Sequence, residues 1–565
     1  MARVEEGGPE MGHSTRLLIV ALAIFFGLAG RLDATTYYIA ANGSDSNTGT
    51  INTSPWLHAP GMPNCTGNCA KTIPQPGDKF IFRGGDTWHL ANSSASPYTG
   101  GTWVWQWSGG SSNCNYPTAT SSCIYIGTDQ TWYSGTSFTR PKLNFDNPTS
   151  TSLVSSCAYS DLMGVNIGNG SYRNINYVIF DDFELYGKCW SAASPNNWIW
   201  FWGIYDTFTN NYFHGWTETT GLASGGDEDP MIAGDGQQVN AVGGVTHNVY
   251  AYNVFDGSDS YCTGLNTCSG GPMIANDQYD VEHNVCRWMT NCISGTSNNL
   301  ATAHDNLFEY IYGSWDGGTH TNVLEMNGQQ ISGSNVSIYN NTIRHINVGM
   351  ILDVWVPSGG AAYVFNNVIY DLRGGAGVNC MQVENANPSA AASVYFTNNT
   401  VDHTASTCMI RPIPGEGQVW NGTVYFQNLH SIGSITSVSQ MESSCGSGNT
   451  CTWIDNGNEV FQTESVANGQ GYTSSNNYQP TAISNATYHA GGNLSSSCST
   501  YSSDSALCSG STGGVTNTAG SGADPILSIP SPLLRGTTWD AGAYQYSGLT
   551  SSLPNAPTGL VASVQ

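Results

Sequence analysis

The chain carries few charges for its length, and few of those are positive. Only 10% of the 565 residues are charged, and 40 acidic residues stand against 15 Lys and Arg, which gives a formal net charge of −25. Such an acidic surface repels nucleic acid and anionic membranes. We therefore expect neither as a partner. It would also repel an anionic polysaccharide unless a cation such as Ca2+ lay between them.

Helical patterning and long apolar runs are also scarce. Few segments space apolar residues as a helix does, whereas short alternating runs and 67 Gly predict an almost all-β protein. The one long apolar run, residues 17–30 after Arg16, is too short to span a bilayer. It predicts a secretory signal peptide over residues 1–34, cleaved after Ala34, and an extracellular protein.

Cysteine, by contrast, is plentiful. Sixteen Cys in an exported chain predict disulfides, and no pair shows the CxxC spacing of a zinc site. Six expected pairs are close in sequence, and two are spaced like neighbouring repeats. They are Cys65 with Cys69, Cys114 with Cys123, Cys262 with Cys268, Cys286 with Cys292, Cys445 with Cys451, Cys498 with Cys508, Cys157 with Cys189, and Cys380 with Cys408.

A short phrase recurs through the centre of the chain: alternating residues, an Asn, then an apolar residue. Its Asn residues follow one another at steps of 22 to 35 residues, a spacing typical of a solenoid. We expect one Asn per coil at the same corner, bonded to the Asn of the next coil. These are Asn253, Asn284, Asn306, Asn341, Asn367, Asn399 and Asn428.

The segment after Thr35 carries a resemblance to a known superfamily. It contains Gly43-Ser44-Asp45-Ser46-Asn47, then Pro76-Gly77-Asp78 and Arg83-Gly84-Gly85. Near the other end of the chain, residues 540–546 look like a closing strand. With the Asn repeats, this resembles secreted proteins of the pectate-lyase-like superfamily. The resemblance implies a right-handed, single-stranded parallel β-helix. We expect a signal peptide at 1–34, a β-helix at 35–435 with a loop-rich insertion at 95–175, a C-terminal cap at 436–548 and a linker at 549–565.

Acidic residues precede three of the Asn corners. Glu325, Asp353 and Glu384 take similar places in successive repeats, and Arg411 follows in the next one. On adjacent coils about 4.8 Å apart, such carboxylates would raise one another's pKa, so we predict a catalytic column. Aligning Cys380 with Cys408 instead shifts the last two members by one residue, and ordinary solvated acids are the alternative interpretation.

Further candidate site residues lie outside this column. The Gly-rich segment with Trp315, Asp316 and His320 leads directly into Glu325, so we predict that it contributes to catalysis and substrate binding. Trp198, Trp200 and Trp202 alternate, which predicts three rings on one strand face for binding sugars. Acidic clusters at residues 227–229 and at Asp256 with Asp259 are candidate Ca2+ ligands.

These residues support three functions. Carboxylates about 5 Å apart, as Glu325 and Asp353 would be, suit a retaining glycosidase, and wider pairs such as Glu325 with Glu384 approach the inverting geometry. The second function is Ca2+-dependent β-elimination on a uronate polymer, with an Arg as the base because Lys188 is the only Lys after position 142. The third is a non-catalytic glycan-binding or adhesin β-helix. We predict a monomeric, secreted polysaccharide-cleaving enzyme, with hydrolysis ahead of elimination, no assigned cofactor and Ca2+ as the candidate cation.

Overall fold

The computed structural model describes residues 34–546 with internal gaps. The described ranges are 34–107, 109–159, 164–168, 175–191, 197–220, 231–234, 247–264, 268–271, 273–275, 280–295, 301–313, 321–326, 334–356, 359–373, 379–385, 391–413, 420–510, 516–517, 527–528 and 533–546.

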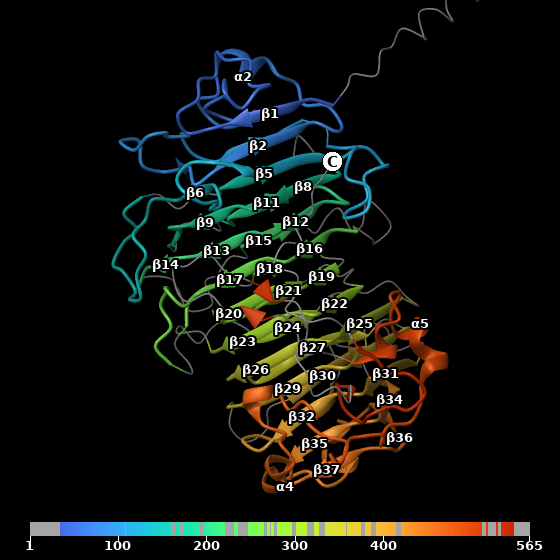
Figure 1. Cartoon of the computed structure of the whole chain (residues 1–565). Coiled ribbons are helices and arrows are strands. Elements are labelled where there is room, and N and C mark those ends of the chain that lie inside the picture. The colour runs from blue at the N-terminus through green and yellow to red at the C-terminus, as the bar shows by residue number, and fades with distance from the viewer. Residues whose placement is uncertain are drawn as a thin grey trace, which may run out of the picture.

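Three long parallel sheets form the body of the protein (Figure 1). Sheet A contains β1 (Thr36–Ile39), β2 (Lys79–Gly84), β5 (Ile124–Tyr133), β8 (Val178–Asp181), β12 (Thr207–Thr209), β16 (Val249–Ala251), β19 (Asp280–Glu282), β22 (Thr302–His304), β25 (Asn335–Tyr339), β28 (Ala361–Phe365), β31 (Ala392–Thr397), β34 (Asn421–Gln427) and β36 (Thr450–Asp455). Sheet B contains β3 (Thr87–His89), β6 (Lys142–Asn144), β9 (Glu184–Tyr186), β13 (Tyr212–His214), β17 (Val254–Asp256), β20 (Val285–Met289), β23 (Leu307–Ile311), β26 (Thr342–Ile346), β29 (Val368–Leu372), β32 (Thr400–His403), β35 (His430–Gly433) and β37 (Val460–Gln462). Sheet C contains β4 (Trp103–Trp105), β7 (Val165–Ile167), β11 (Ile199–Phe201), β15 (Ile232–Gly234), β18 (Ile274–Ala275), β21 (Ile293–Gly295), β24 (Asn322–Met326), β27 (Met350–Val356), β30 (Asn379–Asn385) and β33 (Met409–Ile413).

The chain visits the three sheets in turn, so each circuit is one coil of a solenoid. β25, β26 and β27 make one such coil, and each pairs in parallel with its counterpart β28, β29 and β30 of the next. The protein is therefore a parallel β-helix, as predicted. Residues 95–175, expected as an insertion, contribute β4 to β7 to the three sheets and thus form part of the solenoid.

The core lies between the three sheets and is filled by inward-facing apolar side chains. Like residues stack along it from coil to coil: the rings of Phe213 and Phe255 lie 4.5 Å apart and nearly parallel. In sheet C the inward residues include Leu324, Leu352 and Val354, each at most 1% exposed. Because strand residues alternate between faces, Glu325 and Asp353, which follow Leu324 and Leu352, point away from the core.

An Asn ladder runs through the corner between sheets A and B. Asn253, Asn284, Asn306, Asn341, Asn367 and Asn399 are joined in sequence, because each side-chain amide donates to the Oδ1 atom of the next Asn at 2.9 to 3.1 Å. Each of these amides also donates to a backbone carbonyl inside the corner, so the buried polar groups are satisfied. The predicted ladder is confirmed over these six residues.

The two ends of the ladder differ from the prediction. Asn211 precedes Asn253 in the same ladder, at a step of 42 residues that the repeat did not reveal. Asn428 does not belong to it: its φ of 58° places it in the left-handed position that precedes the ladder residue, where it bonds Gly492. Both positions favour Asn, the one for its amide and the other for its backbone, which explains the error of one residue.

The C-terminal segment after β36 folds back onto the last coils (Figure 1). Tyr501 packs on Tyr363 and Tyr395 of sheet A, and Tyr478 packs on Tyr370 of sheet B. Its helices are α4 (Glu464–Gly469), η2 (Ser474–Asn476), η3 (Ser495–Ser497), α5 (Cys498–Tyr501) and η4 (Ala506–Cys508), whereas η1 (Val438–Gln440) precedes β36. Short strand pairs are β38 (Ser509–Gly510) with β41 (Leu533–Leu534) and β39 (Thr516–Asn517) with β40 (Leu527–Ser528), and β10 (Cys189–Trp190) pairs with β14 (Thr217–Glu218) beside the solenoid.

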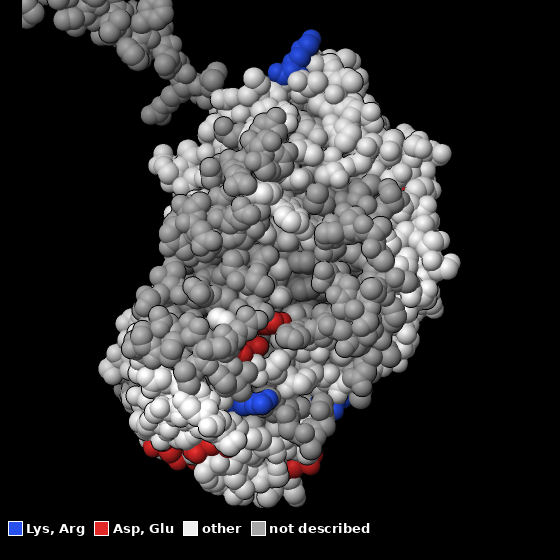
Figure 2. All heavy atoms as spheres, turned by 180° about the vertical axis from the view of Figure 1, so that it is seen from behind, with Lys and Arg blue, Asp and Glu red and all other residues white. Residues whose placement is uncertain are grey.

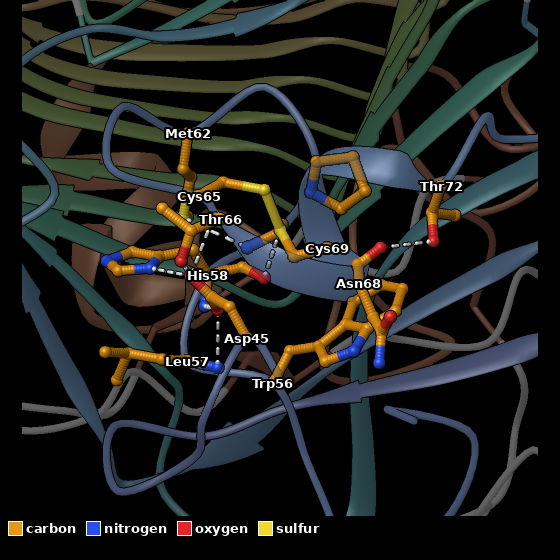
Figure 3. The surroundings of a disulfide bond; sticks show 12 residues. Asp45, Trp56, Leu57, His58, Met62, Cys65, Thr66, Asn68, Cys69 and Thr72 are labelled. Atoms are coloured by element: carbon orange, nitrogen blue, oxygen red, sulfur yellow. Dashed lines mark hydrogen bonds and ion pairs between the residues drawn. A yellow bond between two sulfur atoms is a disulfide. The ribbon is translucent and has the colours of Figure 1, made fainter. Parts of the chain in front are cut away.

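All eight expected cysteine pairs are disulfide-bonded. Figure 3 shows the first disulfide, which joins Cys65 to Cys69 and lies beside Asp45. Cys69 belongs to α2 (Gly67–Lys71), and Cys65 lies just before it. The Asp45 carboxylate accepts hydrogen bonds from the backbone N–H groups of His58 and Thr66, at 2.9 and 3.0 Å. The acidic turn that contributed to the superfamily resemblance therefore ties the first loops together. In the described part of the chain, no helix has the length and apolar character needed to cross a membrane.

Candidate functional site

The candidate site lies on the outward face of sheet C, where four polar side chains occupy one column. Glu325 of β24 pairs with Asp353 of β27, Asp353 with Gln382 of β30, and Gln382 with Arg411 of β33. Glu325, Asp353 and Arg411 thus occupy equivalent positions on their strands, as predicted. Glu325 and Asp353 lie one coil apart. The third member of the column is Gln382 and not Glu384.

Glu384 lies two residues further along β30, in register with Trp355. A shift of two residues keeps its side chain on the same face, so Glu384 lies diagonally from Asp353, about 8 Å away between Cα atoms by ideal strand geometry. The predicted column is wrong at this one position. The loops that join sheet C to sheet A differ in length between coils, so counting back from the Asn corner does not fix the register of sheet C.

The three carboxyl groups are shielded from bulk water. Glu325 and Asp353 are each 4% exposed and Glu384 is 7% exposed, although the strand alternation turns all three away from the core. Arg411, by contrast, is exposed. The acids therefore interact with one another in a low-dielectric environment, which strengthens their mutual repulsion.

Amide side chains hold two of the acids. Asn322 donates to Glu325 Oε2 at 3.1 Å, and Gln382 donates to Glu384 Oε1 at the same distance. Gln382 also lowers the pKa of Asp353, so one amide acts on two of the carboxyl groups. Gln382 could not be identified as a site residue from the sequence, because only the strand register distinguishes its place from that of Glu384.

Asp353 has a perturbed pKa. Its burial, followed by the negative charges of Glu384 and Glu325, raises the pKa of the Asp353 carboxyl from 3.8 to about 7, against the opposing hydrogen bond from Gln382. Near neutral pH, a carboxyl with this pKa is protonated in a large fraction of the molecules, so it can act as a general acid.

Three buried polar atoms beside the acids have no hydrogen-bond partner among the described residues. They are Oδ1 of Asp353 and Nε1 of Trp355 on β27, and Oδ1 of Asn322, whose amide nitrogen donates to Glu325. Buried polar atoms are nearly always satisfied in folded proteins, and unsatisfied ones call for an explanation. Trp355 was also missed in the sequence, where one Trp among 17 gave no signal of its place beside the acids.

The three tryptophans predicted to share a face are divided between the core and the outside. Trp200 lies in the same outward column as Glu325, four coils away, and its ring stacks on Trp202 at 6.5 Å. Trp198 is fully buried and packs on Phe213 in the core. The prediction is wrong for Trp198, because β11 begins at Ile199 and the strand alternation does not extend to the residue before it.

The other predicted residues fall in two groups. Trp315, Asp316, His320 and the acidic cluster at 227–229 lie outside the described residues. Asp256 is buried and accepts a hydrogen bond from Arg287 at 2.5 Å, whereas Asp259 accepts one from His214 at 2.8 Å. Both of these acids therefore already have cationic partners or donors. In the described ranges, no group of three or more His, Cys, Asp or Glu is arranged to hold a metal ion.

Figure 2 shows the face opposite to that of Figure 1. Near its middle lies a small group of acidic atoms, with basic atoms close by, and most of the remaining described surface in this view is uncharged.

The chain matches no protein-family model and no curated protein. It is similar in structure to pectate lyase Pel9A, at 15% identity and a TM-score of 0.38 over 91% of this chain and 97% of that one. It is also similar to the GH136 lacto-N-biosidase from Eubacterium ramulus (10% identity, TM-score 0.38, 79% and 70% covered) and to XylC in complex with xylose (9% identity, TM-score 0.35, 76% and 86% covered). These structural neighbours are a polysaccharide lyase and other carbohydrate-related proteins; the β-helix assignment itself rests on the strand pairing described above.

Proposed function

We propose that this protein is an exported glycoside hydrolase that cleaves a polysaccharide at the outward face of sheet C. The observation that carries the proposal is Asp353, a buried carboxyl with a pKa raised to about 7 between two other acids. Acid-assisted glycoside cleavage requires a carboxyl that holds its proton beside a second carboxyl, and Glu325 occupies that second position on the adjacent coil.

In this proposal Asp353 is the general acid and Glu325 is the nucleophile. Adjacent coils place their Cα atoms about 4.8 Å apart, a spacing that permits the carboxyl separation of about 5 Å typical of retaining glycosidases. Asp353 donates its proton to the glycosidic oxygen while a Glu325 carboxylate oxygen bonds to the anomeric carbon; the bond between that carbon and the glycosidic oxygen breaks, and the leaving sugar departs with a free hydroxyl. Asp353 then removes a proton from water, which attacks the same carbon, releases Glu325 and restores both groups.

Calcium-dependent elimination on a uronate polymer is the second candidate. Arg411, exposed and two coils from Asp353, favours it, because it could remove the proton beside the uronate carboxyl. The calcium itself fits less well: a carboxyl that holds its proton near neutral pH is a poor ligand for a hard cation. Hydrolysis is therefore preferred.

The test is incubation of the protein with neutral and uronate polysaccharides, in Ca2+ or in chelator. New reducing ends without unsaturated products, insensitive to chelator and lost in Asp353→Asn, are expected. The exposed acid Glu464 provides a matched acid-to-amide control, and Glu464→Gln should retain full activity. Unsaturated, chelator-sensitive products would establish elimination instead, and binding without any cleavage would establish a glycan-binding protein.

A further inference from the structure

We propose that the sugar bound beside Asp353 is uncharged and that Trp355 recognises it, by donating its indole N–H to a hydroxyl of that sugar. The inference rests on the proposed carbohydrate site and specifies its substrate class. It is carried by the position of Trp355, by its unsatisfied donor and by the charges around it.

Trp355 lies on the substrate face and outside the core. Its strand neighbours Val354 and Val356 both belong to the main hydrophobic cluster, whereas Trp355 belongs to none of the clusters formed by the described residues. It shares its face with Asp353, two residues before it, and pairs in register with Glu384. The indole is thus placed between two of the three acids.

The unsatisfied atoms at this face match the chemistry of a sugar. Trp355 is 8% exposed and its Nε1 has no partner among the described residues, and the same is true of Oδ1 of Asp353 and Oδ1 of Asn322. One buried donor and two buried acceptors would each cost free energy if they stayed unpaired. Hydroxyl groups can both donate and accept, so a sugar ring can satisfy all three, while the indole face packs on its C–H groups.

The charges of the site oppose a uronate at this position. Glu325, Asp353 and Glu384 are all less than a tenth exposed, so an added carboxylate would meet them in a low-dielectric environment. Arg411, the cation of the same column, lies one coil beyond Gln382 and is exposed. A neutral sugar avoids this repulsion and still meets the hydrogen-bonding needs of the face.

The experiment uses the full-length protein with the Asp353→Asn substitution, which permits binding to be measured without cleavage. Binding is measured to an array of neutral and uronate oligosaccharides of equal length. We expect hits among the neutral members, and binding to uronate members alone, or to none, overturns the inference. For the neutral hit, Trp355→Phe keeps an aromatic face but removes the N–H, and should weaken binding about five- to ten-fold, with a larger loss in Trp355→Ala.

The matched control is Trp420→Phe. Trp420 is also buried with an unpartnered Nε1, but it lies in the core cluster, so its substitution should leave binding unchanged. In the cleaving protein, Trp355→Phe should raise KM by a similar factor with little change in kcat; a variant that only lowers Tm, as the control would, contradicts the inference. If the wild type cleaves nothing but neutral sugars bind through Trp355, hydrolysis fails and the inference stands. If cleavage occurs and the Trp355 variants bind normally, the inference fails and hydrolysis stands.

Discussion

Replacing Asp353 by Asn should stabilise the folded protein above pH 7 while abolishing cleavage. In the folded protein, burial and the neighbouring acids raise the pKa of this carboxyl from 3.8 to about 7. In the unfolded chain the same carboxyl is solvated and its pKa returns to the ordinary range. Between these two values the folded state holds a proton that the unfolded state has lost, so stability falls as the pH rises through this window.

The size of the effect follows from the displacement. A shift of about three pKa units corresponds to roughly 4 kcal/mol, which is an upper bound because the structure relaxes around the charge. Asn has the same shape but cannot ionise, and its amide oxygen can still accept from Gln382. The free energy of unfolding of Asp353→Asn should therefore exceed that of the wild type by about 2–4 kcal/mol at pH 8, and by little at pH 4.

The assay is urea unfolding of both proteins with disulfides intact, at pH 4, 6 and 8. The difference between the two curves isolates Asp353, because all other titrating groups are common to both. Glu464→Gln removes an exposed acid and should show no such pH-dependent difference. A stability difference that is equal at pH 4 and pH 8, or a variant less stable than the wild type at pH 8, would refute the electrostatic argument.

Three further predictions concern charge and packing. Glu384→Gln removes a negative charge from a residue whose Cα atom lies about 8 Å from that of Asp353, so the pKa of Asp353 should fall. The alkaline limb of the profile of kcat/KM against pH should move down by about one pH unit. An unmoved limb would mean that Asp353 is not the general acid. Asn306→Ala interrupts the ladder and leaves buried backbone and amide groups unpaired, which should lower the free energy of unfolding by about 3 kcal/mol in urea titrations, with activity per folded molecule retained. Arg287→Met leaves the buried Asp256 of sheet B without its cation, whereas Glu309 keeps its ion pair with Arg344. The substitution should cost about 3–5 kcal/mol by the same measurement, and a loss below about 1 kcal/mol would show that Asp256 is neutral.

The fold could be predicted from the sequence because the Asn ladder repeats one interaction in each coil. Each ladder Asn satisfies its own corner and the next, so the requirement recurs in every repeat and leaves a visible mark. The repeat cannot be recognised in the sequence where the spacing is unusual or where a neighbouring position also favours Asn. Asn211 was missed behind a long step, and Asn428 was misplaced because the neighbouring left-handed position also favours Asn.

The site could be predicted to the correct coils but not to each residue. The Asn corner joins sheets A and B, whereas the acids lie on sheet C, beyond connections whose lengths differ from coil to coil. Glu325 and Asp353 were aligned correctly, and Glu384 was placed two residues from its true register. A register error of two residues leaves the side chain on the same face of the strand, so Glu384 still lies near Asp353 and raises the pKa of Asp353.

This two-residue offset changes the chemistry that the face can support. In a straight column, three carboxylates would follow one another at equal spacing, and the middle one would be repelled equally from both sides. In the protein, Gln382 takes the third place and donates to Glu384, and Glu325 is the acid in register with Asp353 on the adjacent coil. The arrangement leaves one acid directly opposite Asp353, as the proposed glycoside cleavage needs, and a diagonal acid, Glu384, whose charge raises the pKa of Asp353 more than that of Glu325 does. The same offset places Glu384 in register with Trp355, so the acid and the indole lie side by side on the outward face.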